Sequence, residues 1–496
     1  MIRERSSMES SAVSPAQPDR PGIGTGVRAI RGAFLDFVDD PWRHVGDEQA
    51  ATRFFADGLL VVDDRGIIVD FGPHDEVAAR HPSTEVVDIP DRLILPGFID
   101  GHIHIPQTRI LGSYGEQLLP WLEKWVFPEE RRYFDREYAE EGVRRFFDTL
   151  LASGTTTCQA FTTAQPVTTE VVFEEAARRN MRIITGITAI DVNAPQWFTT
   201  TADEFYAAAT EQIARYHGVG RSSYAITPRF AYGATKDLLA ACGRLKAENP
   251  DVWVHTHISE NPSEIRGVLA LHDDCADYLE VYEKYGLVGP KFTGGHGVWL
   301  TDGEFRRLSE AGAAVTFCPC SNLYLGSGLF RLGRATDPEH RVLLTFGSDV
   351  GGGNRFSMLN VLEDAYKVGM LNNTQLDGSI DPSRQDTAEA ERNRLSPYRA
   401  FYSVTLGGAE ALRLDDKVGN FDIGKEADFV VLDGRGGPPA VHWRTGLSAG
   451  DGAPATLEHA AELLFAIMMV GDDRAVAETW VMGDRAYSRD AVDDVG

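Results

Sequence analysis

The sequence predicts an α/β fold with two parts, a (β/α)₈ TIM-type barrel and a small β-sandwich domain built from both chain ends. Three observations predict it. In the middle of the chain, β-like and helical segments alternate over roughly 250 residues, the size of such a barrel. Short β-like runs occur near both ends of the chain, and histidines and an aspartate stand at the ends of several central strands. A doubly wound sheet is the alternative, because the periodicity does not exclude it.

The eight predicted barrel strands are short apolar runs rich in β-branched and aromatic residues. They cover residues 93–99, 155–159, 182–187, 224–228, 253–257, 291–296, 314–318 and 342–349. Helical patterns lie between them, at residues 135–153, 201–216, 236–248, 262–271 and 302–311. The first of these helices has the clearest pattern, with Val143, Phe146, Phe147 and Leu150 on one side and Gly154 as its stop.

The β domain is predicted from runs at residues 32–37, 58–62 and 66–71 and from similar runs at 426–432 and 479–487. We therefore predict four regions: a disordered tail over residues 1–27, an N-terminal β part over 28–92, a metal-dependent catalytic barrel over 93–415, and a C-terminal β part with a closing helix over 416–496. Residues 371–397 and 435–454 are polar or rich in Gly and Pro, which predicts long surface loops.

Composition narrows the class of protein. The 496-residue chain carries a net charge of −26, which disfavours binding to nucleic-acid polymers and to membranes. Five scattered cysteines are too few for a disulfide framework in a chain of this length, and this fits a reducing cytoplasm. The N-terminus has no apolar segment typical of a signal peptide, so we expect a cytoplasmic location.

A metal site is indicated by side chains at the ends of four predicted strands. His102 and His104 are spaced so that both imidazoles point to one side of an extended chain. His257, His296 and Asp349 close three further strands. Barrel enzymes gather catalytic groups at this end of their strands, and such ligands suit zinc, with iron(II) as the alternative. His255 forms a second H-x-H pair with His257, and we favour His257 as the ligand because it is nearer the strand end.

Glu260 follows His257 by three residues, and the two would share a face if a helix begins directly after the strand. A carboxylate beside a metal-activated water is a natural proton carrier. A glutamate at a helix start, placed there by the helix dipole, is the alternative.

Several longer stretches resemble the amidohydrolase superfamily and, within it, the guanine deaminase family, over nearly the whole chain from about Gly32 to Tyr487. The most specific are PGFIDGHIHIPQT, GEQLLPWLEKWVFPEERRY, YAITPRF, VHTHISEN and FCPCSNLYLGSGLF, supported by GSDVGGG, TLGGAEAL, GNFDIGKEADFVVL and GDDR. The stretch AIDVNAP at residues 189–195 departs from the usual run of the family but keeps Asp191 and Asn193.

This resemblance implies hydrolytic deamination of guanine to xanthine and ammonia by a metal-activated water. It implies one zinc ion per subunit, with iron possible, held by His102, His104, His257 and Asp349. The catalytic groups would be Glu260, His296 and Asp349. The purine would be contacted by Gln107, Arg229, Phe230 and Glu260, beside His257 and Asp349. The resemblance also implies a homodimer that acts on a small-molecule purine.

Other activities remain open on the sequence alone. A related aminated heterocycle, such as 8-oxoguanine, a pterin or a triazine, is the nearest alternative substrate. Hydrolysis of a cyclic amide at two metals bridged by a carboxylated lysine is disfavoured, because the strand at 224–228 contains no lysine. A non-catalytic binding protein is disfavoured because every metal and acid–base role has a candidate residue.

Overall fold

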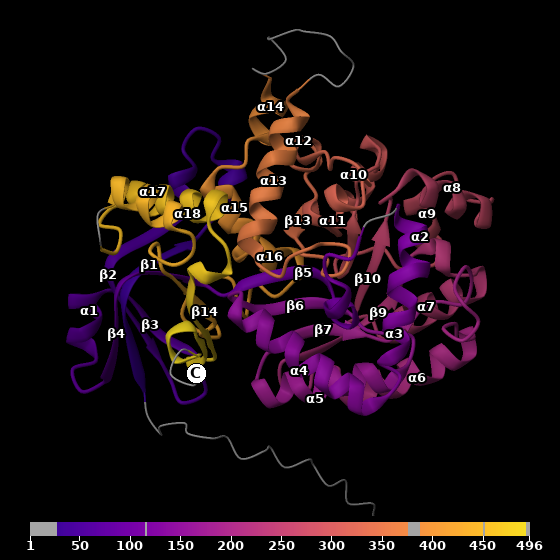
Figure 1. The fold of residues 1–496 in the computed structure, drawn as a ribbon, viewed down its shortest axis with the longest axis horizontal. Coiled ribbons are helices and arrows are strands. Elements are labelled where there is room, and N and C mark those ends of the chain that lie inside the picture. The colour runs from indigo at the N-terminus through magenta and orange to yellow at the C-terminus, as the bar shows by residue number, and fades with distance from the viewer. Residues whose placement is uncertain (1–26, 115–116, 375–386, 450–451, 493–496) are drawn as a thin grey trace, which may run out of the picture.

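We describe a computed structural model of the chain, which covers residues 27–114, 117–374, 387–449 and 452–492. Two bodies lie side by side in it, a barrel surrounded by helices and a sheet formed by both chain ends (Figure 1). The predicted tail at residues 1–27 lies outside the described residues, apart from Val27.

The barrel contains eight parallel strands and is nearly closed, so the barrel prediction is confirmed and the doubly wound alternative is wrong. The strands pair in the order β13-β12-β11-β10-β9-β7-β6-β5, and the two-residue β8 pairs with β9. Their bounds are β5 Phe98–His104, β6 Thr155–Phe161, β7 Arg182–Gly186, β8 Thr188–Ala189, β9 Ser222–Pro228, β10 Trp253–Ile258, β11 Phe292–His296, β12 Ala314–Phe317 and β13 Leu343–Phe346.

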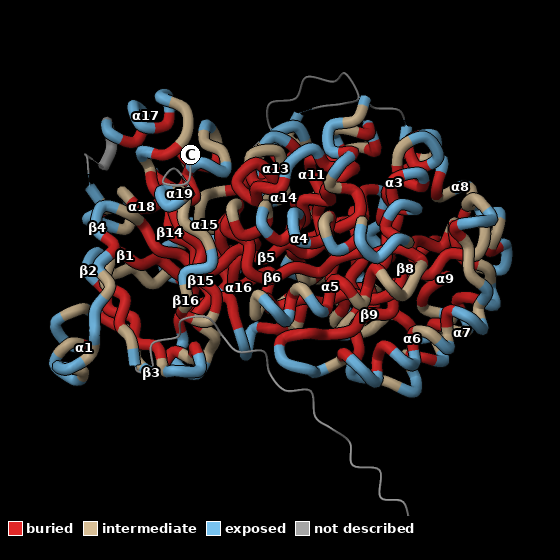
Figure 2. Tube along the Cα trace, turned by 60° about the horizontal axis from the view of Figure 1, so that its bottom comes forward, coloured by how far each residue is buried: buried red, intermediate tan, exposed pale blue. Residues whose placement is uncertain are grey.

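Helices cover the outside of the barrel, and the five predicted from sequence match within about a residue at each end. They are α4 Arg136–Ala152, α6 Ala202–Tyr216, α7 Lys236–Glu248, α8 Pro262–Leu271 and α10 Asp302–Glu310, joined by α5 Pro166–Arg179, α9 Tyr278–Glu283, α11 Pro319–Tyr324, α12 Leu332–Ala335, α13 Met358–Asn372, α14 Ala388–Asn393, α15 Pro397–Ser403 and α16 Leu406–Ala411. The Asp135 side chain caps the start of α4, whose buried face includes Phe146 and Phe147. Buried residues gather along the strands and exposed ones on the outer turns of the helices (Figure 2).

The β domain is confirmed as a second sheet built from both chain ends, and its seven strands form one continuous sheet in the order β16-β15-β14-β4-β1-β2-β3. Apolar side chains from six of these strands form one cluster, centred on Phe34, Phe429 and Trp480. The strands are β1 Arg28–Phe37, β2 Thr52–Val62, β3 Ile68–Pro73, β4 Glu85–Pro96, β14 Phe429–Leu432, β15 Val476–Val481 and β16 Asp484–Ser488, with α1 His74–Arg80 and α19 Arg489–Val492 beside them.

The predicted strand at 93–99 is wrong, because the chain passes from one sheet to the other inside it. β4 ends at Pro96 and pairs with β1 and β14, whereas β5 begins at Phe98 and pairs with β6. Gly97 joins them where a side chain has no room, since a Cβ there would lie 2.2 Å from Oγ1 of Thr156. The continuous apolar run therefore contains two strands, and the histidines belong to the second strand instead of following its end.

The loop predicted at residues 435–454 is also wrong, because α17 Pro439–Ala449 lies within it and packs beside α18 Leu457–Val470. Proline is tolerated in the first turn of a helix, and the buried Val441 anchors this one. Of the predicted loop at 371–397, residues 375–386 lie outside the described residues and the remainder includes α14. Among the described helices, no segment has the length and apolar character needed to span a bilayer.

Buried ion pairs join the two bodies on the side of the barrel where the strands begin. Arg182 and Arg221 both bond to Glu426, and Arg221 also reaches Asp428, just before β14. Buried ion pairs of this kind fix the orientation of the barrel relative to the sheet, because separating the partners would leave buried charges unpaired. The pocket described next lies at the opposite end of the barrel.

Candidate metal centre and active site

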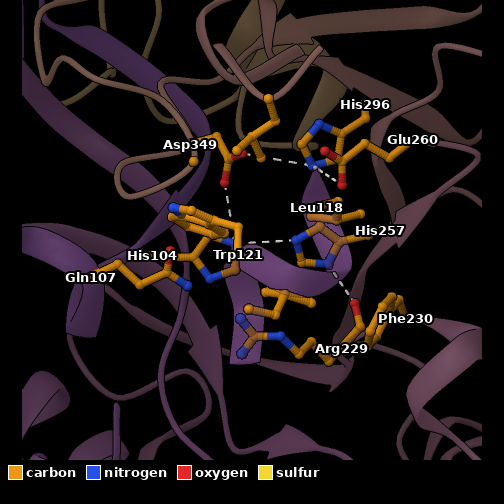
Figure 3. A pocket seen from close by; sticks show the side chains of 13 residues that line it. His104, Gln107, Leu118, Trp121, Arg229, Phe230, His257, Glu260, His296 and Asp349 are labelled. Carbon is orange, nitrogen blue, oxygen red and sulfur yellow. Dashed lines mark hydrogen bonds and ion pairs between the residues drawn. The ribbon is translucent and has the colours of Figure 1, made fainter. Parts of the chain in front are cut away.

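A pocket opens where the barrel strands end, and it contains about 360 Å³ of space not filled by protein atoms. Figure 3 shows Gln107 and Arg229 toward one end and His296 and Glu260 toward the other, with the imidazoles of His104 and His257 between them. The lining residues are His104, Gln107, Leu118, Trp121, Leu122, Arg229, Phe230, His257, Glu260, His296, Leu325, Asp349 and Gly352.

The structure brings together all four side chains expected to hold a metal, His102, His104, His257 and Asp349. The Nε2 atoms of His104 and His257 lie 3.1 Å apart. Asp349 Oδ1 lies 3.2 Å from Nε2 of His104 and 3.5 Å from Nε2 of His102. Four donors around a zinc ion at about 2.0–2.1 Å would lie about 3.3 Å from one another, so these spacings fit one ion.

Hydrogen bonds at Nδ1 orient the imidazoles of His102 and His257 so that Nε2 faces the common centre. Nδ1 of His257 bonds to the carbonyl oxygen of Arg229, which leaves Nε2 with its lone pair. Nδ1 of His102 lies 3.0 Å from Nε2 of His255. His255 is therefore a supporting neighbour of His102, and His257 joins the cluster, as the sequence analysis favoured. Such outer partners fix the tautomer and the ring orientation of metal-binding histidines.

The seam between the last and first barrel strands holds two of these side chains in register. The amide of Asp349 donates to the carbonyl oxygen of His102 at 2.8 Å. The buried Asp100 accepts bonds from the backbone and the hydroxyl of Ser348. Gly347 makes this approach possible, because a Cβ there would lie 2.7 Å from Cβ of His102. Asp349 also has a left-handed backbone (φ +48°), a conformation that non-glycine residues adopt mainly at constrained sites.

Burial sets the charge of this cluster. It lowers the pKa of His104 to about 3 and lowers the pKa values of His102 and His257 as well. Burial alone would raise the pKa of Asp349, but the nearby imidazoles of His102 and His104 outweigh this and hold the pKa well below its usual value. Neutral imidazoles beside an ionised carboxylate are the protonation states in which these groups bind metals.

His296 and Glu260 lie next to this cluster. His296 Nε2 is 3.6 Å from Oε2 of Glu260 and 3.8 Å from Oδ2 of Asp349, and its Nδ1 bonds to Oδ1 of Asn322 at 2.9 Å. Burial lowers the pKa of His296, but the charges of Glu260 and Asp349 raise it above its usual value overall. Burial raises the pKa of Glu260 to about 7, against the opposing effect of His296. A carboxyl group that titrates near neutrality suits proton transfer.

Glu260 reaches the pocket by a different backbone path from the helix considered in the sequence analysis. Ser259 adopts a left-handed conformation (φ +48°) directly after β10, and α8 begins only at Pro262. The carboxylate of Glu260 accepts a bond from the Ser327 hydroxyl at 3.0 Å. The sharp turn, rather than helical spacing, aims this side chain into the pocket.

The side chains expected to contact a purine lie at the other end of the pocket. Arg229 and Phe230 follow β9, and Phe230 forms an isolated bridge with His257. Gln107 lies in the short helix Ile105–Ile110 that follows β5. The structure thus brings the predicted site residues to one pocket, except His102, which is buried within the metal-ligand cluster and does not line the pocket.

Glu130 is a buried residue at this end that the sequence analysis did not identify. Its carboxylate accepts bonds from Nη1 of Arg229 at 3.0 Å and from Nε2 of Gln107 at 2.9 Å. Burial raises the pKa of this carboxyl, and Arg229 and Gln107 oppose that shift. Glu130 belongs to α3 Phe127–Arg132, within a stretch that the family resemblance covered without assigning it a role.

An insertion between β5 and α4 forms the apolar wall of the pocket. It contains α2 Leu118–Trp121, a π-helical turn Leu122–Val126 and α3. Leu118, Trp121 and Leu122 line the pocket, and Trp121 bonds through Nε1 to Oγ of Ser113. Sequence reasoning missed these three residues, although their aromatic and apolar character within a pattern of short helices was the available signal. They give the pocket an apolar wall.

This fold and this cluster define a class of metal-dependent hydrolase, and the comparisons agree. The Amidohydrolase family model matches residues 93–486, and the chain belongs to that family.

Three similar proteins are guanine deaminases. The guanine deaminase of Escherichia coli (strain K12) is 43% identical over 468 residues, 93% of this chain and 98% of that protein. The guanine deaminase of Mus musculus is 31% identical, covering 86% of this chain and 91% of that protein. The crystal structure of guanine deaminase from Bradyrhizobium japonicum superposes with a TM-score of 0.91 at 66% identity, covering 94% of this chain and 100% of that one.

Proposed function

We propose that this protein is a guanine deaminase, which hydrolyses guanine to xanthine and ammonia. The observation that carries the proposal is that a metal-ligand set, a carboxyl titrating near neutrality and a paired arginine and glutamine all face one pocket. The similarity to guanine deaminases over nearly the full length of the chain supports the same substrate.

One divalent ion, zinc in our proposal, would be held by His102, His104, His257 and Asp349. Three neutral imidazoles and a carboxylate whose ligand atoms all lie within 4.8 Å of one another suit it, and Nε2 of His102 is buried without a hydrogen-bond partner among the described residues. When bound, such an ion lowers the pKa of a coordinated water to about 7 and so supplies a strong nucleophile at neutral pH.

The catalytic steps are assigned to three residues. Asp349 accepts a proton from the attacking water through Oδ2, and His296, whose Nε2 lies 3.8 Å from that oxygen, holds the water. Glu260 delivers a proton to ring nitrogen N3, which draws electrons from C2 and makes it the point of attack. Oxygen bonds to C2 as the C2–N3 double bond opens onto the protonated N3. Asp349 then passes its proton to the exocyclic amine, the bond from C2 to that nitrogen breaks, and ammonia leaves. The proton of the new hydroxyl returns to Glu260 as the C2 carbonyl of xanthine forms.

The ring is held by groups that match its polar edge. Arg229 presents guanidinium donors suited to the acceptors O6 and N7. Gln107 contributes an amide, and Phe230, which is 4% exposed, provides an aromatic face. His257 and Asp349 complete the wall beside the reacting carbon.

We further propose a cytoplasmic enzyme that acts as a homodimer. The five cysteines are all free thiols in the structure, which suits a reducing compartment. The dimer is proposed on the resemblance alone.

The test is ammonia release by the purified, zinc-reconstituted protein from guanine, adenine and 8-oxoguanine in parallel. We expect one ammonia and one xanthine per guanine consumed, and turnover of adenine lower by about 10⁴-fold, because adenine carries a donor where Arg229 needs an acceptor. Faster turnover of 8-oxoguanine, or of a pterin or triazine, would reassign the substrate, and no ammonia from any ring would reject the proposal.

A further inference from the structure

The purine-binding end of the pocket contains a buried carboxylate that does not itself line the pocket. Glu130 is fully buried, and it lies behind Gln107 and Arg229 as seen from the pocket. The same oxygen, Oε1, accepts from Nε2 of Gln107 at 2.9 Å and from Nη1 of Arg229 at 3.0 Å. The two ring-binding side chains therefore share one anchor.

This anchor determines which way the Gln107 amide faces. A carboxylate beside an arginine is an acceptor only, so the amide must turn its NH₂ group toward Glu130. Its carbonyl oxygen, Oε1, is buried and has no hydrogen-bond partner among the described residues. Gly351 allows this orientation, since a Cβ there would lie 2.1 Å from Oε1. Gln107 thus offers an unused acceptor at the pocket wall.

The same anchor fixes Arg229 as a donor. Both of its bonds to Glu130 come from Nη1, and Nη2 and Nε bond to no other described residue. The guanidinium also lies 5.9 Å from the centre of the Phe127 ring, on the same helix as Glu130. Arg229 therefore presents a donor and Gln107 an acceptor, and the same buried carboxylate, Glu130, holds both side chains.

We propose that Glu130 is a positioning residue that makes the site select rings with a carbonyl next to a ring N–H. This inference rests on the proposed function and deepens it. Guanine presents O6 beside N1–H, which matches a donor from Arg229 and an acceptor from Gln107. Adenine presents the reverse pattern, an amine beside an unprotonated N1. Two buried acceptors that face each other without a hydrogen between them weaken the binding of adenine far more than a small change of ring shape would.

The test is Glu130→Gln, with Glu129→Gln as the matched control. Glu129 is the preceding residue of α3 and is also buried, but it accepts from the Tyr138 hydroxyl and does not line the pocket. A glutamine at position 130 offers both a donor and an acceptor, so Gln107 is free to turn over. The readouts are kcat and KM for guanine, and the inhibition constants of hypoxanthine and adenine as competing rings.

For Glu130→Gln we expect KM for guanine to rise about 10-fold and the preference for hypoxanthine over adenine to fall by a similar factor. We expect kcat to change by less than about 3-fold, because Glu260, His296 and Asp349 lie at the other end of the pocket. Glu129→Gln should leave both KM for guanine and the preference for hypoxanthine over adenine unchanged. A fall in kcat at constant KM, or equal effects of the two variants, would overturn the positioning role.

A second variant keeps the proposal testable if Glu130→Gln fails to fold. Gln107→Ala leaves the Glu130–Arg229 pair intact and should lower the same preference. In the Gln107→Ala, Glu130→Gln double variant, the loss of preference for hypoxanthine over adenine should be clearly smaller than the sum of the two single losses, because Glu130 acts through Gln107. Additive effects, or an unchanged preference in Gln107→Ala, would reject it. Wild-type protein that releases no ammonia from guanine would instead reject the proposed function.

Discussion

The two ends of the pocket are positioned by different kinds of structure. At the metal end, His102, His104, His257 and Asp349 lie in barrel strands or directly after them, and backbone hydrogen bonds across the barrel seam set their spacing. At the ring-binding end, Arg229 and Gln107 are set by Glu130, a side chain from an insertion outside the barrel. The metal end is thus fixed by the backbone of the barrel, and the ring end by one buried ion pair.

This difference shows how one fold can keep its chemistry and change its substrate. A strand end cannot move without breaking the barrel, whereas α2 and α3 belong to a connection that can vary in length and sequence. We therefore expect changes at the metal end to abolish reaction with every ring. Changes at the other end should alter which ring is accepted.

The largest effect is expected from Asp349→Asn. Loss of a ligand and of the proton acceptor together should lower kcat on the order of 10⁴-fold and reduce bound zinc. The measurements are metal content and ammonia release. The exposed Asp416→Asn serves as control, and a variant at Asp349 that keeps both metal and rate would contradict the assignment.

Glu260→Gln should lower kcat by about 10³-fold and leave the metal content unchanged. The amide keeps the shape of the side chain but cannot deliver a proton to N3. Metal analysis and steady-state kinetics check both parts, and a near-normal kcat would remove the proton-carrier role.

Arg229→Ala should lower kcat/KM for guanine by about 10²-fold with metal retained. It should also lower the free energy of unfolding by about 3 kcal/mol, because Glu130 is left buried without its counter-charge. Denaturant unfolding should show partial recovery in the Arg229→Ala, Glu130→Gln double variant. A double variant less stable than Arg229→Ala would show that the buried charge is not the cause.

The smallest effect concerns pH. The pKa of Glu260 is raised to about 7, so its acid form, which donates the proton, is present below pH 7 and lost above it. We expect kcat/KM to fall above about pH 7. Ser327→Ala removes a donor to the carboxylate, which raises the pKa of Glu260 and moves this fall to higher pH by about one unit or less. Movement to lower pH would contradict the proton-donor role.

The sequence predicts the metal end better than the ring end, for a physical reason. Strand periodicity and the position of a histidine at a strand end are local properties, so the sequence predicts seven of the eight barrel strands and the four side chains that the structure brings together. Glu129 and Glu130 are adjacent and alike in sequence. Only the tertiary structure brings one against the Tyr138 hydroxyl and the other against Arg229.

The errors in the predicted elements have the same origin. The run at residues 93–99 reads as one strand, because nothing local shows that its two halves pair with different sheets. The helix at Pro439–Ala449 is hidden by flanking Gly and Pro, and its reason to form is packing against α18.

Titrating zinc into metal-stripped protein shows whether one ion held at the strand ends drives hydrolysis of guanine. Ammonia release from guanine is measured at each addition. We expect almost no release without metal and a rise that levels off at one zinc per chain. Full activity of the stripped protein, or a plateau at two ions per chain, would contradict it.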